Sequence, residues 1–165
     1  WGVTAIVPII NQLSPPGASL LAGVLVVALM IIPTITVLTQ SALRTVPVGY
    51  LQGAAALGIS ENQSLLRLVV PAARQGIFSA MVLGAARAIG ETMVVLMVCG
   101  NIVQVPISVF EPVRALTANI ALEMPYAMGD HRASLFVAGL LMLLLVSVLV
   151  VVGEWVGRRQ REMGV

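Results

Sequence analysis

Lysine is absent from this chain of 165 residues, and all nine of its basic residues are arginine. A phosphate-binding P-loop needs its lysine, so the sequence excludes that kind of ATP site. A single cysteine, Cys99, excludes an intrachain disulfide and a cysteine-rich metal site. His131 is also alone, and we expect a solvated loop residue there rather than a metal ligand. The net charge of +2 is small and scattered, which argues against nucleic-acid binding.

Charged residues are scarce as well, at 10% of the chain against about 25% in soluble domains, while 59% of the residues are hydrophobic. We therefore expect an all-α membrane protein with a single transmembrane domain over residues 1–165. Three apolar stretches are long enough to cross a bilayer, over about 18–40, 75–98 and 133–157. Pro33 lies inside the first, and it predicts either a simple kink, which we favour, or a hinge that moves in transport.

Residues 1–13 are also apolar but form a shorter stretch, which Pro8 interrupts. We interpret this stretch as the end of a truncated upstream span. The first residue is Trp1 rather than methionine, so we expect the chain to be a fragment of a longer protein.

Arginines gather in two of the segments outside these spans. They are Arg44, Arg67 and Arg74 in the segment 44–74, and Arg158, Arg159 and Arg161 after the third span. The segment 99–132 has only two arginines against three acidic residues. The positive-inside rule therefore predicts that 44–74 and the C-terminus are cytoplasmic and that 99–132 is an outer loop.

The segment 44–74 has the pattern of two short helices held between membrane spans. Pro47 is preset for a first helical turn, and the small residues Gly53–Ala56 allow another backbone to come close. Gly58 is the kind of residue that commonly ends a helix. Ser60 with Gln63 predicts a capping box that starts a second helix, which we expect to end at Pro71.

This segment resembles the conserved cytoplasmic loop of ABC-transporter permease subunits. Five positions match the pattern of that loop with its spacing intact, and they are Ala54, Gly58, Leu68, Val70 and Pro71. Two positions depart, because Gln52 replaces the usual acid and Gly53 the first alanine. The resemblance implies docking of a separate ATPase on this loop. The coupling residues it implies are Tyr50, Leu51, Gln52, Gly53, Ala54, Ala55 and Gly58.

Arg87 and Glu91 lie within the second expected span, and Arg87 is about 16 Å from Gly76 at 1.5 Å per residue. A charge near the middle of a bilayer costs about 2.5–3.5 kcal/mol on insertion scales, so both should face the bundle interior or a watery path. Because Arg87 and Glu91 are four residues apart, we expect their side chains on one face of the helix, where they can form an ion pair. They could form an internal bridge that fixes helix packing. We favour the alternative that the guanidinium binds an oxyanion and the carboxylate accepts a hydrogen bond from its protonated form.

The outer loop 99–132 is interrupted by Pro106 and Pro112, and residues 113–123 then show helical spacing. This helix is too short to cross a membrane, so we expect a re-entrant or surface helix. It could cap the pathway or meet an external binding protein. It could equally be an ordered loop helix that covers the bundle.

Two segments narrow the resemblance to phosphate ABC permeases, and to the C permease of that system more than to its A partner. They are RAIGETMVVLMVCGN (Arg87–Asn101) and PVRALTANIALEM (Pro112–Met124). The resemblance implies that Arg87 and Glu91 line the phosphate path. It also implies a cytoplasmic ABC ATPase dimer, a second homologous permease and an extracytoplasmic phosphate-binding protein as partners.

From these patterns we expect a non-enzymatic permease subunit of an ATP-driven phosphate importer in a prokaryotic cell membrane, without a cofactor or metal. One alternative is an ABC permease for another oxyanion, such as sulfate or molybdate. Another is a secondary carrier in which Arg87 and Glu91 serve as an ion relay. A scaffold subunit that does not transport is disfavoured by the two charges within the span.

Overall fold

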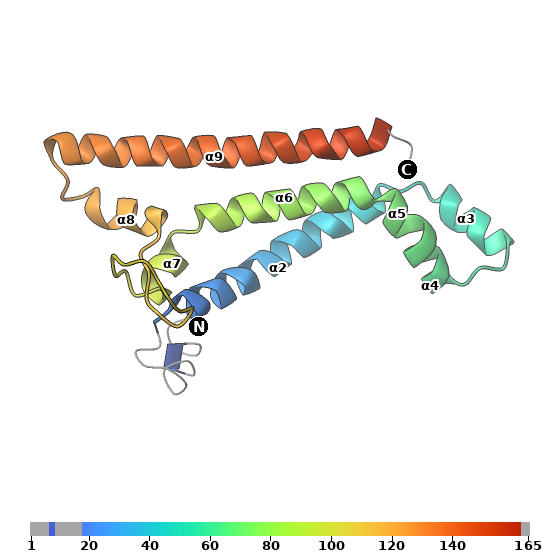
Figure 1. Ribbon diagram of the computed structural model, residues 1–165. Helices are drawn as coiled ribbons and strands as arrows, with labels where there is room; N and C mark the ends of the chain where they lie inside the picture. Colours follow the sequence, from blue (N-terminus) through green and yellow to red (C-terminus); the bar gives the residue numbers. More distant parts are fainter. Residues whose placement is uncertain (1–6, 9–17, 163–165) are drawn as a thin grey trace. The chain divides into compact units, whose positions relative to one another are not determined.

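The computed structural model describes residues 7–8 and 18–162. The upstream span expected over residues 1–13 lies outside this range, apart from Val7 and Pro8. The described chain is built from helices and connecting segments (Figure 1). They are α2 (Leu20–Arg44), α3 (Gly49–Ala56), α4 (Glu61–Ser64), the π-helix η2 (Leu65–Val69), α5 (Val70–Ala72), α6 (Arg74–Gly90), α7 (Met93–Val98), α8 (Leu116–Glu123) and α9 (Gly129–Glu162). Outside these helices, the described residues contain one isolated β-bridge and no named strand, so the expected all-α class is confirmed.

The chain divides into two compact units, one with residues up to 31 and residues 87–147, the other with residues 32–86 and 148 onward. In the second unit, neighbouring helices come close to one another at glycine positions. A Cβ added at Gly76 would overlap Cβ of Ala42, and one added at Gly153 would lie 2.6 Å from Cγ1 of Val82. Close packing on small residues is typical of membrane helices.

The first unit has a small apolar core around Ala22 and Val98, next to the buried Cys99. A Cβ added at Gly23 would overlap the sulfur of Cys99, so α2 can pass this close only with glycine at that position. The segment 99–132 returns to the start of α2, where the backbone N–H of Leu20 donates to the carbonyl of Glu111 at 3.0 Å.

Two helical stretches are long and apolar enough to cross a membrane by themselves, α2 and residues Gly129–Gly157 of α9. Helix α2 runs through Pro33 without interruption. A third candidate is a bent pair, Glu61–Ala72 with Arg74–Gly90, which turns by 68° at Ala73. Helix formation therefore does not stop at Pro71, as the sequence predicted, but continues to Ala72. The π-helix precedes this proline, which has no N–H to give to the helical ladder.

The second expected span, 75–98, is not one continuous helix. Helix α6 ends at Gly90, and α7 begins only at Met93. Residues Glu91 and Thr92 form the interruption, within the segment that was expected to carry both buried charges.

Candidate functional site

The expected coupling residues lie on α3 and at its C-terminal end. The carbonyl of Pro47 accepts a hydrogen bond from the N–H of Tyr50 at 3.1 Å, but α3 begins at Gly49 with Val48 as its N-cap, so Pro47 lies just before the first turn and not within it as predicted. At the other end Gly58 has φ +72°, a conformation that favours glycine. Its N–H donates to Ala55, and the N–H of Ile59 donates to Ala54, both at 3.0 Å. This pair of bonds is a Schellman motif, so Gly58 ends the helix as expected.

The predicted capping box at Ser60 and Gln63 is wrong. Helix α4 does begin after Ser60, but the Ser60 side chain makes no capping hydrogen bond. Instead, the Ser60 carbonyl accepts two bonds from Ser64, from its N–H at 2.9 Å and its hydroxyl at 3.0 Å. The first turn of α4 is thus closed by bonds from Ser64 to the Ser60 carbonyl, without a side-chain cap from Ser60.

Helix α3 and the start of the following helix enclose a groove of about 410 Å³. It is lined by Leu51, Ala55, Ile59, Glu61, Ser64 and Leu65. The expected coupling residues divide into two groups. Ala54 is buried, only 3% exposed, while Tyr50, Leu51, Gln52, Gly53, Ala55 and Gly58 are exposed.

Arg87 and Glu91 do not share one helical face, which corrects the geometry predicted from their spacing. Arg87 is exposed in the last turn of α6, whereas Glu91 is half-buried in the interruption after Gly90. Among the described residues, no ion pair joins the two side chains. The structure therefore gives no support to the internal bridge that was the alternative to a binding role.

Hydroxyl groups satisfy the backbone at this interruption. The Thr92 hydroxyl donates to the carbonyl of Gly90 at 3.2 Å, and the Thr117 hydroxyl, from α8, donates to the carbonyl of Glu91 at 3.1 Å. Two grooves of about 300 and 330 Å³ meet at Thr117 and Met142. They are lined mainly by apolar side chains of α9 and by the start of α8, so the interruption lies beside largely apolar surfaces.

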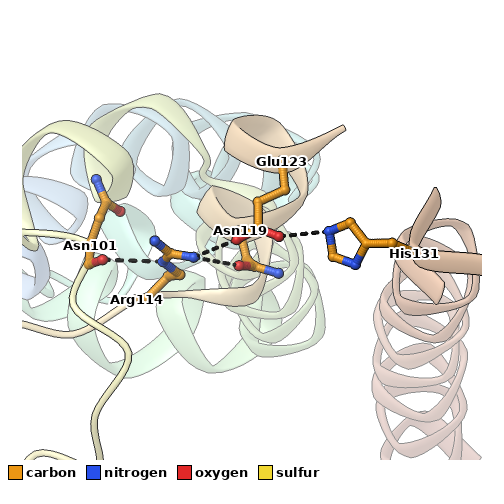
Figure 2. A network of polar contacts seen from close by, with 5 residues as sticks. All are labelled: Asn101, Arg114, Asn119, Glu123 and His131. Atoms are coloured by element: carbon orange, nitrogen blue, oxygen red, sulfur yellow. Dashed lines mark hydrogen bonds and ion pairs between the residues drawn. The ribbon is translucent and has the colours of Figure 1, made fainter. Parts of the chain in front are cut away.

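A polar network that the sequence did not predict lies in the segment 99–132. Figure 2 shows Arg114 at its centre, donating to the carbonyl of Asn101 at 3.1 Å and to Oδ1 of Asn119 at 3.0 Å. Arg114 also forms an ion pair with Glu123, at 2.7 Å. The second oxygen of Glu123 lies 2.8 Å from Nε2 of His131. Asn119 and Glu123 are four residues apart on α8, and this spacing could have indicated a shared polar face.

His131 lies in the first turn of α9 and not in a loop, although its side chain is 54% exposed. Within residues 7–8 and 18–162, no group of three His, Cys, Asp or Glu side chains is placed to hold a metal ion. Cys99 is buried, and burial raises the pKa of its thiol.

The model of the family described as binding-protein-dependent transport system inner membrane component matches residues 3–162. The probable ABC transporter permease protein YqgH of Bacillus subtilis is 35% identical over 164 residues, which are 97% of this chain and 53% of that relative. The phosphate transport system permease protein PstC of Mesorhizobium japonicum is 33% identical over 142 residues, 86% of this chain and 43% of the relative. PstC 1 of Mycobacterium tuberculosis is 37% identical over 128 residues, 75% of this chain and 38% of the relative.

The chain thus spans about half or less of the length of these curated relatives. No solved structure matches it. The family model covers nearly the whole chain, with both long apolar helices and the short helices α3 and α4 between them. This chain therefore belongs to the family of inner membrane components of binding-protein-dependent transport systems.

Proposed function

We propose that this chain is the membrane-spanning part of a permease subunit of an ATP-driven phosphate importer in a prokaryotic cell membrane. The observation that carries the proposal is the run of relatives named as phosphate transport permeases, at 33–37% identity over most of the chain. The coupling residues and the charged segment of α6 lie within the region that these relatives match.

The coupling role rests on the form of the α3–α4 element. Its small-residue helix is closed by the Schellman motif at Gly58, and its exposed side carries Tyr50 and Leu51 beside the 410 Å³ groove. A separate ABC ATPase dimer docks here from the cytoplasm in this proposal. The arginine-rich segments on either side support that orientation and a cytoplasmic C-terminus.

The substrate path is proposed to pass Arg87 and Glu91. The guanidinium is exposed and makes no ion pair among the described residues, so its planar set of donors is available to an oxyanion. Glu91 lies one residue beyond the end of α6, four residues after Arg87 along the chain, and is less exposed than Arg87. A carboxylate at this position can accept a hydrogen bond from a protonated phosphate, which distinguishes phosphate from sulfate.

Two further partners complete the proposal. A second homologous permease closes the pore with this chain, and an extracytoplasmic phosphate-binding protein delivers the substrate to the outer loop. Because the binding protein selects first, it is proposed to set most of the specificity.

The docking test uses cysteine cross-linking in the full-length permease, expressed with its partner subunits. In a Cys99→Ala background, Gln52→Cys should cross-link to the ATPase. Gln104→Cys, an exposed position in the outer loop, is the matched control and should not. Cross-linking from Gln104 alone would refute the proposed orientation. Recovery of no ATPase with the intact permease would point to a secondary carrier instead.

The substrate test compares uptake of labelled phosphate and labelled sulfate by the same cells. Wild-type cells should take up phosphate in preference to sulfate, and Arg87→Gln should abolish uptake at an equal amount of transporter. Glu91→Gln should reduce phosphate uptake more than Glu91→Asp does. Unchanged phosphate uptake by Glu91→Gln would remove its role, and preferential sulfate uptake would move the proposal to another oxyanion.

A further inference from the structure

The helix interruption at Glu91 depends on a side chain from a distant part of the sequence. Thr117 lies in the first turn of α8, and its hydroxyl donates to the Glu91 carbonyl 26 residues earlier. Threonine in a helix usually bonds to its own helix or points to solvent. Here the hydroxyl joins two segments of the same compact unit.

The bond compensates for a cost that the interruption creates. The last carbonyls of a helix have no intrahelical partner, and an unsatisfied backbone group in a membrane costs several kcal/mol. The carbonyl of Ala88 accepts from the N–H of Glu91, and that of Gly90 from the Thr92 hydroxyl. The Glu91 carbonyl is paired with Thr117. Thr117, which supplies this donor, itself lines a groove bordered mainly by apolar residues of α8 and α9.

Helix α8, which carries Thr117, is itself held in place by packing and hydrogen bonds. Ala118 is 0% exposed, and α8 packs against α7. Further along the helix, Asn119 and Glu123 both accept hydrogen bonds from Arg114. Thr117 is therefore fixed on a braced helix rather than on a mobile loop.

We infer that Thr117 is a positioning residue for Glu91, because its hydroxyl fixes the backbone from which the Glu91 carboxylate extends. Thr117 does not touch the substrate. Its effect on transport rests on the proposed function, in which Glu91 lines the phosphate path. Its effect on the interruption rests on the hydrogen bond alone.

The first test measures backbone hydrogen exchange in the full-length permease and needs no substrate. Thr117→Val keeps the side-chain shape and removes the donor, so exchange over residues 88–96 should rise roughly threefold to tenfold. Thr117→Ser keeps a hydroxyl and should restore slow exchange. The matched control is Thr36→Val, because the Thr36 hydroxyl bonds only within its own helix, to Ile32 at 2.7 Å. Unchanged exchange in Thr117→Val would overturn the inference.

The second test measures phosphate uptake at equal amounts of transporter. Thr117→Val should lower the maximal rate several-fold, leave KM nearly unchanged, and be rescued by Thr117→Ser. In a Glu91→Asp background, Thr117→Val should cost much less than in the wild type. An equal cost in both backgrounds would show that Thr117 does not act through Glu91. If the wild type carries no phosphate, the proposed function fails, while the exchange measurement still decides the role of Thr117.

Discussion

Gly153 offers a direct test of the close packing in the second unit. Replacing it with alanine places a methyl group 2.6 Å and 2.7 Å from the two Cγ atoms of Val82 and 3.2 Å from its Cβ. Rotating the valine side chain does not move its Cβ, so α9 and α6 must separate. Overpacking of this kind costs about 1–3 kcal/mol.

The matched control is Gly139→Ala on the same helix, where an added Cβ meets no atom within 4 Å. Both substitutions gain the same helix propensity, up to about 1 kcal/mol, so their difference isolates the clash. We expect the free energy of unfolding, measured by SDS titration of the full-length permease in mixed micelles, to be about 1–3 kcal/mol lower for Gly153→Ala than for Gly139→Ala.

A second variant checks the cause. In a Val82→Ala background the two Cγ atoms are gone, so Gly153→Ala should cost at least about 1 kcal/mol less than in the wild type. Equal stability of Gly153→Ala and Gly139→Ala would show that the two helices do not pack as described. If Gly153→Ala lowers the free energy of unfolding as much in the Val82→Ala background as in the wild type, the clash does not involve the Val82 side chain.

Four further predictions concern the end of α3, the polar network and Cys99. Gly58→Ala should destabilise the end of α3 by about 1 kcal/mol, because φ there is +72°, whereas Gly49→Ala should not; amide exchange over residues 49–59 distinguishes them. Arg114→Met should lower the free energy of unfolding in the SDS titration by about 1–3 kcal/mol, since it removes all the hydrogen bonds from that guanidinium. His131→Ala should change the same quantity by less than about 1 kcal/mol, because this side chain is more than half exposed, and an equal loss in both variants would contradict the network. Burial raises the pKa of the Cys99 thiol, so its thiolate needs a higher pH than usual and maleimide labelling near neutral pH should be slow until SDS unfolds the protein.

The features predicted correctly from the sequence are those that depend on neighbouring residues. The C-terminal end of α3 needs only Gly58 and the carbonyls of the preceding turn, all within six positions. The long apolar runs that became α2 and α9 are likewise visible in composition. Local chemistry and hydropathy therefore suffice for these elements.

Two of the features that were missed depend on contacts between distant residues. The interruption after Gly90 falls inside an apolar run whose hydropathy favours one span, and the Thr117 hydroxyl that supports it comes from a separate helix. The Arg114 network likewise joins four segments through bonds that spacing along the sequence does not specify. The continuation of the helix past Pro71 was missed because a proline normally marks an end, and the preceding π-helix has no clear sequence signal.

The 68° bend at Ala73 has a mechanical consequence. Helical hydrogen bonds reach Ala73 from both arms, from the Ala73 N–H to Val69 at 2.9 Å and from Ile77 to the Ala73 carbonyl at 3.0 Å, so each arm stays ordered up to the corner. The arm 61–72 is about 18 Å long, and the part of α6 in the same unit, 74–86, is about 20 Å. Two helical arms of nearly equal length therefore meet at a single residue, Ala73. When the angle at Ala73 is held constant, a displacement at the free end of one arm produces a displacement of about the same size at the free end of the other arm. Its direction is turned through the angle between the arms.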